Sequence, residues 1–221
     1  GHSNGIGMNP GSTGHVYNNW IEGIVDDKSG DGDYAIAFYG QGSDNLTSRI
    51  YNNIILHVVM PFMFLNREDA QGQVYEFVHN TIYNFTGKSP VKFYCKGTVD
   101  EATQPPVFAR VQNNIFSEGS NAEIYDAYGF KNFYGNTDGI TGLDCLDYED
   151  TFQNNTFQMD NSSLVFFRDT THHDFHIESA SPARQSGIEL LNGPITIDFD
   201  SIVRTSSPPD QGSFQFQYYG T

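Results

Sequence analysis

The chain has 221 residues, enough for one or two domains of about 150 residues and for a sizeable buried core. Its 18 Phe and 13 Tyr residues make it too aromatic for a disordered segment. Its 11 Lys and Arg against 27 Asp and Glu give a net charge of −16, which repels phosphate backbones and argues against nucleic acid as a partner. No stretch approaches the roughly 18 consecutive apolar residues that a membrane-spanning helix needs.

A six-residue phrase recurs between residues 14 and 160, at 16–21, 50–55, 77–82, 111–116, 133–138 and 152–157. In each copy an apolar residue stands three places before an Asn and a polar residue four places before it. Polar and apolar positions therefore alternate with the period of a strand. The Asn residues on which the copies align are Asn19, Asn53, Asn80, Asn114, Asn136 and Asn155. The pattern predicts an all-β fold built from repeated strand–turn–strand units.

Stacked units of this kind place equivalent residues about 4.8 Å apart and merge their apolar positions into a core that no unit buries alone. The recurrent Asn suits a tight corner, because Asn tolerates left-handed backbone conformations and its amide can bond the Asn of the next unit. We therefore expect a ladder of asparagine amides. A β-sandwich with coincidental Asn-Asn turns is the alternative interpretation.

The repeated phrase resembles the successive coils of the right-handed parallel β-helix superfamily, typified by pectate-lyase-like proteins and other polysaccharide lyases. The resemblance covers about residues 14–160 and implies a right-handed parallel β-helix, a solenoid of about six coils. Many members are enzymes that act on acidic polysaccharides, whereas others are adhesins, spikes or structural rods. The resemblance therefore predicts the fold more narrowly than the activity.

The phrase is absent after about residue 160. Segments 174–187, 197–204 and 209–216 resemble the closing element of secreted bacterial β-helix proteins, although Ser201 replaces the usual Gly and Gln211 the usual Ile. We expect parallel β-helix coils over residues 1–160 and a last coil with an irregular C-terminal cap over 161–221, because the last sheet edge needs protection. The first phrase starts at Val16 with no amphipathic helix before it, which predicts further N-terminal coils or a partner chain over that end.

The column four places before each Asn carries the sharpest catalytic candidates. Stacking places Arg49, Glu76 and Arg110 side by side, with His15 before them. The resemblance implies a lyase with a basic catalytic residue, often assisted by Ca²⁺; here the two arginines would grip a uronate carboxylate and Glu76 would orient them. An arginine acts as a base only when strongly perturbed, since its pKa normally exceeds about 12. The alternative is a surface ladder of ion pairs, each worth less than about 1 kcal/mol.

Tyrosines occupy the column two places before the Asn, as Tyr17, Tyr51 and Tyr134. Their flat rings are surfaces on which pyranose rings stack, so we expect a sugar-stacking site there. The alternative is that adjacent tyrosines pair to stabilise the sheet.

Residues 27–33 match the opening of a calcium loop, with Asp27, Ser29, Asp31 and Asp33 as oxygen ligands at alternate positions. The bidentate Glu of an EF-hand is missing, because Phe38 stands at the twelfth position. We predict a Ca²⁺ site here, with a Gly/Asp-rich surface turn as the alternative.

Other reactive residues follow weaker patterns. The acidic cluster at 144–150 fits a solvated loop or a pair of hydrolytic carboxylates. The histidines of 172–176 fit a loop better than a metal site, because no further ligands stand at diagnostic spacing. Cys95 and Cys145 belong to separated units and are expected to be free thiols.

Together these features predict a secreted or cell-surface protein whose partner is a polysaccharide. As an enzyme it would be a lyase acting on an acidic glycan with Ca²⁺, or less readily a glycoside hydrolase. The alternative is a non-catalytic adhesin, structural rod or glycan-binding module of a larger assembly. The alternative agrees at least as well with the net charge of −16, because an acidic chain repels an acidic glycan unless cations bridge them.

Overall fold

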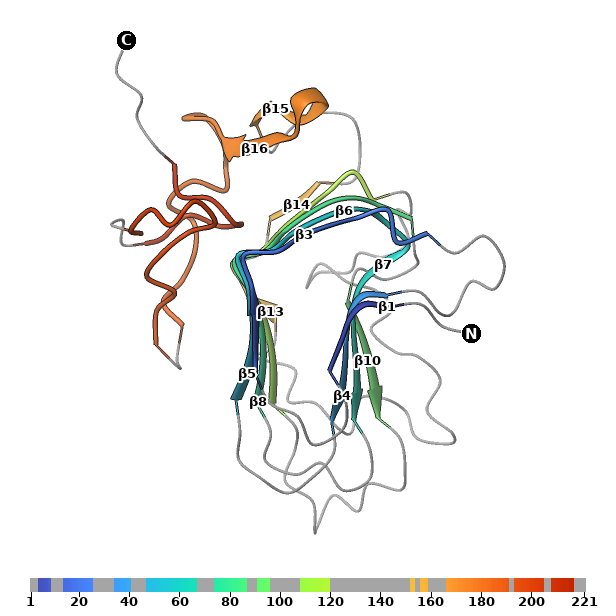
Figure 1. Cartoon of the computed structure of the whole chain (residues 1–221). Helices are drawn as coiled ribbons and strands as arrows, with labels where there is room; N and C mark the ends of the chain where they lie inside the picture. The colour runs from blue at the N-terminus through green and yellow to red at the C-terminus, as the bar shows by residue number, and fades with distance from the viewer. Residues whose placement is uncertain are drawn as a thin grey trace.

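The strands that the structure describes form three parallel sheets and one short antiparallel hairpin (Figure 1). The computed structural model describes residues 4–8, 14–25, 34–40, 47–66, 74–86, 91–95, 108–119, 152–153, 156–158, 166–190, 193–204 and 208–216. The first sheet has the order β1 (Asn4–Met8), β4 (Tyr34–Gly40), β7 (Met60–Asn66), β10 (Val91–Cys95).

The second and third sheets contain the repeated phrase. The second has the order β13 (Phe152–Gln153), β11 (Phe108–Gln112), β8 (Val74–Val78), β5 (Thr47–Tyr51), β2 (His15–Tyr17). The third has the order β14 (Thr156–Gln158), β12 (Ile115–Ser117), β9 (Thr81–Phe85), β6 (Ile54–Val58), β3 (Trp20–Glu22). The hairpin pairs β15 (Phe167–Asp169) with β16 (Asp174–Ile177) across the short 3₁₀ turn η2 (Thr170–His172).

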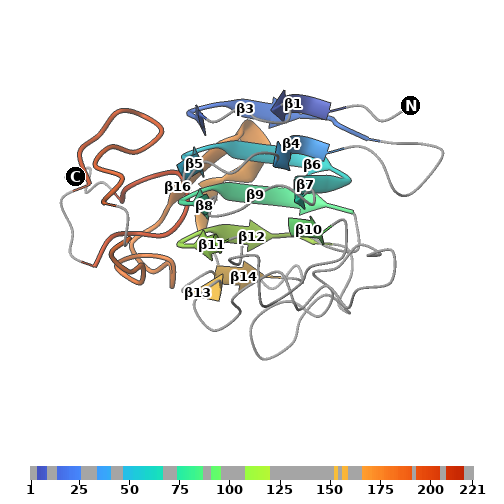
Figure 2. The same ribbon diagram turned by 90° about the horizontal axis from the view of Figure 1, so that it is seen from below.

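From β1 to β12 the described strands visit the three sheets in a constant order, and each visit adds a strand beside the previous one. β1, β2 and β3 form one layer, β4 to β6 the next, β7 to β9 the third and β10 to β12 the fourth (Figure 2). The predicted columns are in register, because Val16 pairs with Ile50, Ile50 with Phe77 and Phe77 with Val111. The prediction of an all-β fold with stacked parallel strands is confirmed.

The core lies between the three sheets. The inward side chains of the repeated phrase are all buried in the first four layers, and they are Val16, Ile21, Ile50, Ile55, Phe77, Ile82, Val111 and Phe116. Phe77 of the second sheet stacks on Phe62 of the first sheet with ring centroids 5.0 Å apart, and on Phe116 of the third at 6.4 Å. The apolar columns therefore join the sheets across the interior.

Asparagine amides form a file along the corner between the second and third sheets. Nδ2 of Asn19 donates to Oδ1 of Asn53 at 2.9 Å, and Nδ2 of Asn53 donates to Oδ1 of Asn80 at 2.9 Å. Nδ2 of Asn80 then donates to Oδ1 of Asn114 at 3.1 Å. Each of these oxygens also accepts the backbone N–H of the preceding Asn in the file, at 2.8–3.1 Å. Asn136 and Asn155, predicted as the last two members, lie outside the described residues.

The left-handed turn of this corner lies one residue earlier than the sequence analysis expected. The ladder Asn was expected to carry both the turn and the amide bond. Instead, positive φ angles of 53–58° occur at the preceding residues, which are Asn18, Asn52, His79 and Asn113. The two tasks are separated because the left-handed residue turns its side chain outward, while the next residue directs its amide into the file.

Residues 166–216 cover the outer faces of the second and third sheets. Leu190 and Ile195 pack against Val78, while Phe175 and Phe214 pack against Ile54 and Leu56. Figure 1 shows this part of the chain outside the corner where the two sheets meet, and Figure 2 shows it alongside several layers. The described residues of this segment lie along the stack, where outward apolar side chains need cover. The cap over the last sheet edge stays a prediction from the sequence.

We expect Asn80→Ala to lower the free energy of unfolding by about 3 kcal/mol or more. The substitution leaves the N–H groups of Asn53 and the carbonyl of Ile50 without their partner, in a part of the file that water does not reach. Asn19→Ala is the matched control, and its loss should be about 1 kcal/mol, because Asn19 is only partly buried. Urea unfolding measures both, and equal losses would contradict a buried ladder.

Candidate functional site

The predicted catalytic column is brought together. β5, β8 and β11 place Arg49 beside Glu76 and Glu76 beside Arg110. Nε of Arg49 lies 2.5 Å from Oε2 of Glu76, and Nη1 of Arg110 lies 3.1 Å from Oε1. Each carboxylate oxygen thus accepts a charge-assisted hydrogen bond from a different guanidinium group.

Glu76 at the centre of the column is buried and the side chains of Arg49 and Arg110 are mostly covered, although we expected an outer face open to a substrate. The Glu76 side chain is only 1% exposed. Nη2 of Arg49 donates to the carbonyl of Gly193 at 3.1 Å, so the C-terminal segment crosses over the column. Because Glu76 is buried and bonded to both arginines, this network has the form of a structural ion-pair cluster. The proposed grip on a uronate stays a prediction from the sequence.

Two predicted stacking residues contact each other. The rings of Tyr17 and Tyr51 are 4.9 Å apart and inclined by 3°. Burial against the cluster of Val78, Leu190 and Ile195 raises the pKa of Tyr51, and the neighbouring Tyr17 raises it further, while Arg49 opposes the shift. Tyr17 remains 49% exposed, so one face of the pair is accessible. Tyr134 lies outside the described residues.

Trp20 is an exposed aromatic residue that the sequence analysis did not single out. It is 40% exposed at the start of β3, one residue after the ladder Asn19. Its Nε1 donates to Oε2 of Glu22 at 3.1 Å, and its ring lies 5.4 Å from His173 and 5.9 Å from Phe175. The sequence does contain one indication of this exposed residue. Trp20 is the single Trp of the chain, and it stands at a position where the other units carry Ile or Thr.

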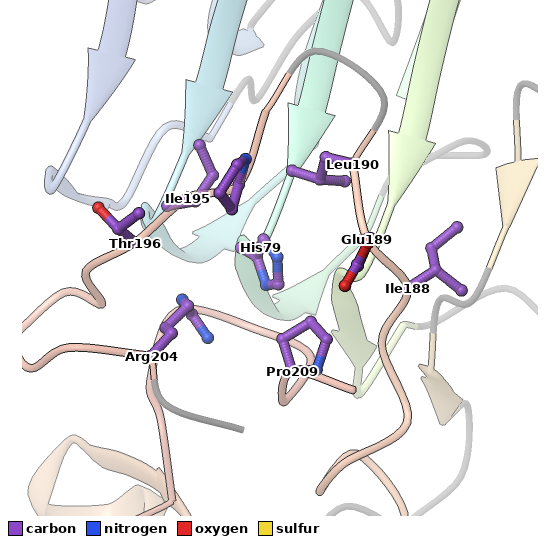
Figure 3. Close-up of a pocket in the computed structure, with 9 residues that line it drawn as sticks. His79, Ile188, Glu189, Leu190, Ile195, Thr196, Arg204 and Pro209 are labelled. Atoms are coloured by element: carbon purple, nitrogen blue, oxygen red, sulfur yellow. The ribbon is translucent and has the colours of Figure 1, made fainter. Parts of the chain in front are cut away.

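A cavity of about 310 Å³ lies between the corner and the C-terminal segment (Figure 3). Its walls are aliphatic, and they are formed by Ile188, Leu190, Pro194, Ile195 and Pro209. His79, Glu189, Thr196 and Arg204 supply its polar groups. Because the cavity is mostly apolar with a few polar groups, it has the composition of a small-molecule site.

The cavity exists because His79 interrupts a series of asparagine anchors. Asn113 donates to the carbonyl of Ile188 at 2.8 Å, and Asn52 donates to the carbonyl of Ile197 at 2.7 Å. His79 occupies the equivalent left-handed position between them. The C-terminal segment is therefore held at Ile188 and Ile197, and Leu190 and Ile195 between these two anchors line the cavity beside His79 (Figure 3).

The His79 ring is neutral with a defined tautomer. Asn113 bonds both the N–H and the carbonyl of Ile188, so its amide orientation is determined and its Nδ2 also faces Nε2 of His79 at 3.2 Å. Nε2 must therefore accept, and the ring proton is on Nδ1. Burial holds the pKa of His79 well below its usual value, and the positive charge of Arg204 adds to this, while the carbonyls of Asp210 and Gly212 oppose it.

Arg204 ties the corner to the end of the described chain. Its Nη2 donates to Oδ1 of Asn52 at 3.1 Å and to the carbonyl of Gly212 at 2.9 Å, and its Nη1 donates to the carbonyl of Asp210 at 3.3 Å. Burial lowers the pKa of Arg204 to about 10, against the opposing effect of Asp198 and Asp210. Within the described residues, Nε of Arg204 has no hydrogen-bond partner. Nδ1 of His79 makes no hydrogen bond of good geometry, although the carbonyls of Asp210 and Gly212 lie near enough to the ring to raise its pKa.

The predicted metal site is not part of the described structure. Asp27, Ser29, Asp31 and Asp33 lie outside the described residues, as do Cys145 and the acidic cluster at 144–150. In the described ranges, no cluster of His, Cys, Asp and Glu side chains is arranged to hold a metal ion. His176 instead lies between Asp174 and Asp200, with its ring nitrogens 2.6 Å and 2.7 Å from their carboxylate oxygens. It therefore joins β16 to the turn at Asp200.

Comparison of the chain with protein-family models, with curated proteins and with solved structures finds no match in any of the three. The part of the chain that the structure describes contains no helix long and apolar enough to traverse a bilayer.

Replacing Glu76 by Gln should destabilise the protein by about 3 kcal/mol, because it removes the charge of the carboxylate that two largely buried guanidinium groups bond. Glu22→Gln, at an exposed carboxylate in the neighbouring sheet, should change stability by no more than about 0.5 kcal/mol. Chemical denaturation compares the two variants. An unchanged midpoint for Glu76→Gln would mean that the cluster contributes nothing to the fold.

His79 should make the protein less stable in mild acid. The unfolded chain binds a proton near pH 6.5 that the folded ring does not bind, so stability is lost as the pH falls below that value. Between about pH 7.5 and about pH 5.5 the loss should reach about 1.4 kcal/mol. His79→Asn keeps the residue type of the other corners and should lack this loss. Urea unfolding at both pH values tests it, and identical pH dependence of the two chains would refute the buried neutral ring.

Proposed function

We propose that the chain is a right-handed parallel β-helix that binds a polysaccharide at a cell surface or in the extracellular space without cleaving it. The constant order of the three parallel sheets supports the coiled path, and strand–crossover–strand connections between parallel strands are right-handed in about 98% of cases. The resemblance of the repeated phrase to secreted β-helix proteins supports the location and the glycan partner.

The observation that carries the non-catalytic function is a contrast in exposure: the predicted catalytic residue Glu76 is buried, whereas aromatic rings at the first corner are exposed. A general acid or base must reach the substrate within hydrogen-bond distance. Glu76 is buried and both of its oxygens are bonded, whereas Tyr17 and Trp20 present partly exposed rings on the two faces that meet at the first corner. Aromatic rings of this kind combine an apolar face with a polar group, which suits binding at a wet surface.

The charge of the chain constrains the glycan. At a net charge of −16 a uronate polymer is repelled unless a cation bridges the two. Calcium at Asp27, Ser29, Asp31 and Asp33 remains our proposal for such a bridge, because carboxylate and hydroxyl oxygens are the ligands that Ca²⁺ prefers. A neutral glycan needs no bridge.

We expect Tyr17→Ala and Trp20→Ala each to weaken glycan binding at least tenfold, because each substitution removes an exposed ring. Affinity electrophoresis against acidic and neutral polysaccharides, with Ca²⁺ or with a chelator, measures the effect. Phe166→Ala is the matched control, since it removes another exposed aromatic ring at the start of the hairpin region and should leave binding unchanged.

The same panel distinguishes binding from cleavage. Release of unsaturated products from a uronate polymer, abolished by Arg49→Ala or Arg110→Ala, would overturn the non-catalytic function in favour of a lyase. Binding of acidic glycans that survives both the chelator and Asp31→Asn would remove calcium from the proposal.

A further inference from the structure

A second file of left-handed residues lies at the end of the third sheet opposite the asparagine ladder. In each of the first four layers it is the fourth residue after the ladder Asn. A left-handed backbone turns the side chain outward, as it does at the first corner. The file therefore presents polar groups on the outside of the stack. Its members, with φ angles of 77°, 50°, 54° and 57°, are Gly23, His57, Asn84 and Glu118.

Side chains from three neighbouring layers form a connected row at this end of the sheet. Nδ2 of Asn84 lies 2.7 Å from Nδ1 of His57, and Nε2 of His57 lies 4.0 Å from Oε1 of Glu22. The other carboxylate oxygen of Glu22 accepts from Nε1 of Trp20 at 3.1 Å. The side chains of Glu22 and His57 are 37% and 43% exposed. The row therefore extends the exposed surface of Trp20 from β3 across β6 to β9.

The contact with Asn84 determines which ring nitrogen of His57 carries the proton. A side-chain NH₂ group only donates, so Nδ1 of His57 accepts and the ring is neutral. Its proton is then on Nε2, the nitrogen that faces Glu22. The 4.0 Å between Nε2 and Oε1 is too long for a direct hydrogen bond. An exposed donor and an exposed acceptor thus stand on the two sides of a gap.

The gap fits a group that accepts and donates at the same time. An oxygen about 2.8 Å from each atom can bridge it, and a hydroxyl group accepts from Nε2–H while it donates to the carboxylate. A bridging water has the same character and can be replaced by a ligand hydroxyl. Gly23 leaves room for a ligand here, because it stands between Glu22 and His57 in the row and a Cβ on it would meet nothing within 4 Å.

The charge of the row excludes an acidic ligand. Within the described residues, no Lys or Arg forms an ion pair with Glu22, so its carboxylate repels a uronate. A neutral sugar supplies hydroxyl groups without adding charge. We infer that Trp20, Glu22 and His57 form the binding site for a neutral glycan. A sugar ring packs on Trp20, and one hydroxyl group bridges Nε2 of His57 and Oε1 of Glu22.

This inference rests on the proposed function, and it names the class of glycan and the residues that recognise its hydroxyl groups. Asn84 is a positioning residue, because it acts only by holding the His57 ring in the required tautomer. The probes are mannan, xylan, galactan and β-glucan as neutral polymers and polygalacturonate as the acidic one. Affinity electrophoresis in the presence of a chelator excludes a calcium bridge. The parent chain should bind the tightest neutral polymer at least tenfold more tightly than polygalacturonate.

The first variant removes the donor of the bridge. His57→Asn keeps a residue type that adopts the same left-handed conformation in the next layer, at Asn84, but its shorter side chain does not reach the gap. We expect binding of the tightest neutral polymer to weaken at least fivefold while the far-UV circular dichroism stays unchanged. Binding as tight as that of the parent chain overturns the inference.

The second variant tests selectivity. Glu22→Gln keeps an acceptor oxygen but removes the charge, so it should raise the affinity for polygalacturonate relative to the neutral polymer at least threefold. Glu178→Gln is the matched control, because it changes the net charge equally at an exposed carboxylate beyond β16 and should leave this ratio unchanged. An unchanged ratio in Glu22→Gln overturns the inference.

Failure of the inference and failure of the proposed function give different results. Neutral-polymer binding that is lost in Trp20→Ala but unchanged in His57→Asn and Glu22→Gln overturns only the inference. Tighter binding of polygalacturonate than of every neutral polymer in the chelator also overturns it. Absence of binding to all five polymers, and to acidic polymers with Ca²⁺, overturns both.

Discussion

The file of asparagine amides at the corner is the interaction on which the rest of the structure depends. Parallel strands hold the layers about 4.8 Å apart, but spacing alone does not prevent a shift of register. A shift by one residue would turn Glu76 inward and Phe77 outward. The ladder opposes this, because the side-chain amides of Asn53 and Asn80 each bond two groups at once. Each donates to the amide oxygen of the next Asn in the file and to the backbone carbonyl two residues before itself. Since Asn53, Asn80 and Asn114 are fully buried, water cannot replace a missing amide.

The residue before each ladder Asn has a different task, and it links the repeat to the C-terminal segment. Its left-handed backbone turns its side chain outward, where Asn52 and Asn113 bond the carbonyls of Ile197 and Ile188. His79 stands between them, and its ring lies against the carbonyls of Asp210 and Gly212 instead. One exception in a repeated position thus produces both the cavity and its buried imidazole.

The same C-terminal segment changes the chemistry of the outward column. Without cover, Arg49, Glu76 and Arg110 would be a surface ladder whose charges are screened by water. Under the segment near Gly193 they become a largely buried cluster, in which removing the Glu76 charge takes away the carboxylate that both arginines bond. A group that is needed to neutralise its neighbours is poorly suited to exchange protons with a substrate. The exposed aromatic rings at the first corner are not under this constraint.

The sequence by itself determined the parallel stacking, the inward columns and the amide ladder, because each arises from a local alternation repeated at equivalent positions. The burial of Glu76, the cavity over His79 and the partial cover of Tyr51 were decided only by the tertiary structure, since they depend on contacts between strands and residues 186–216, which carry no repeat. One trace of this cover was present in the sequence. Ile54, Ile55 and Leu56 are consecutive apolar residues, and a strand that is apolar on both faces is a strand buried on both faces.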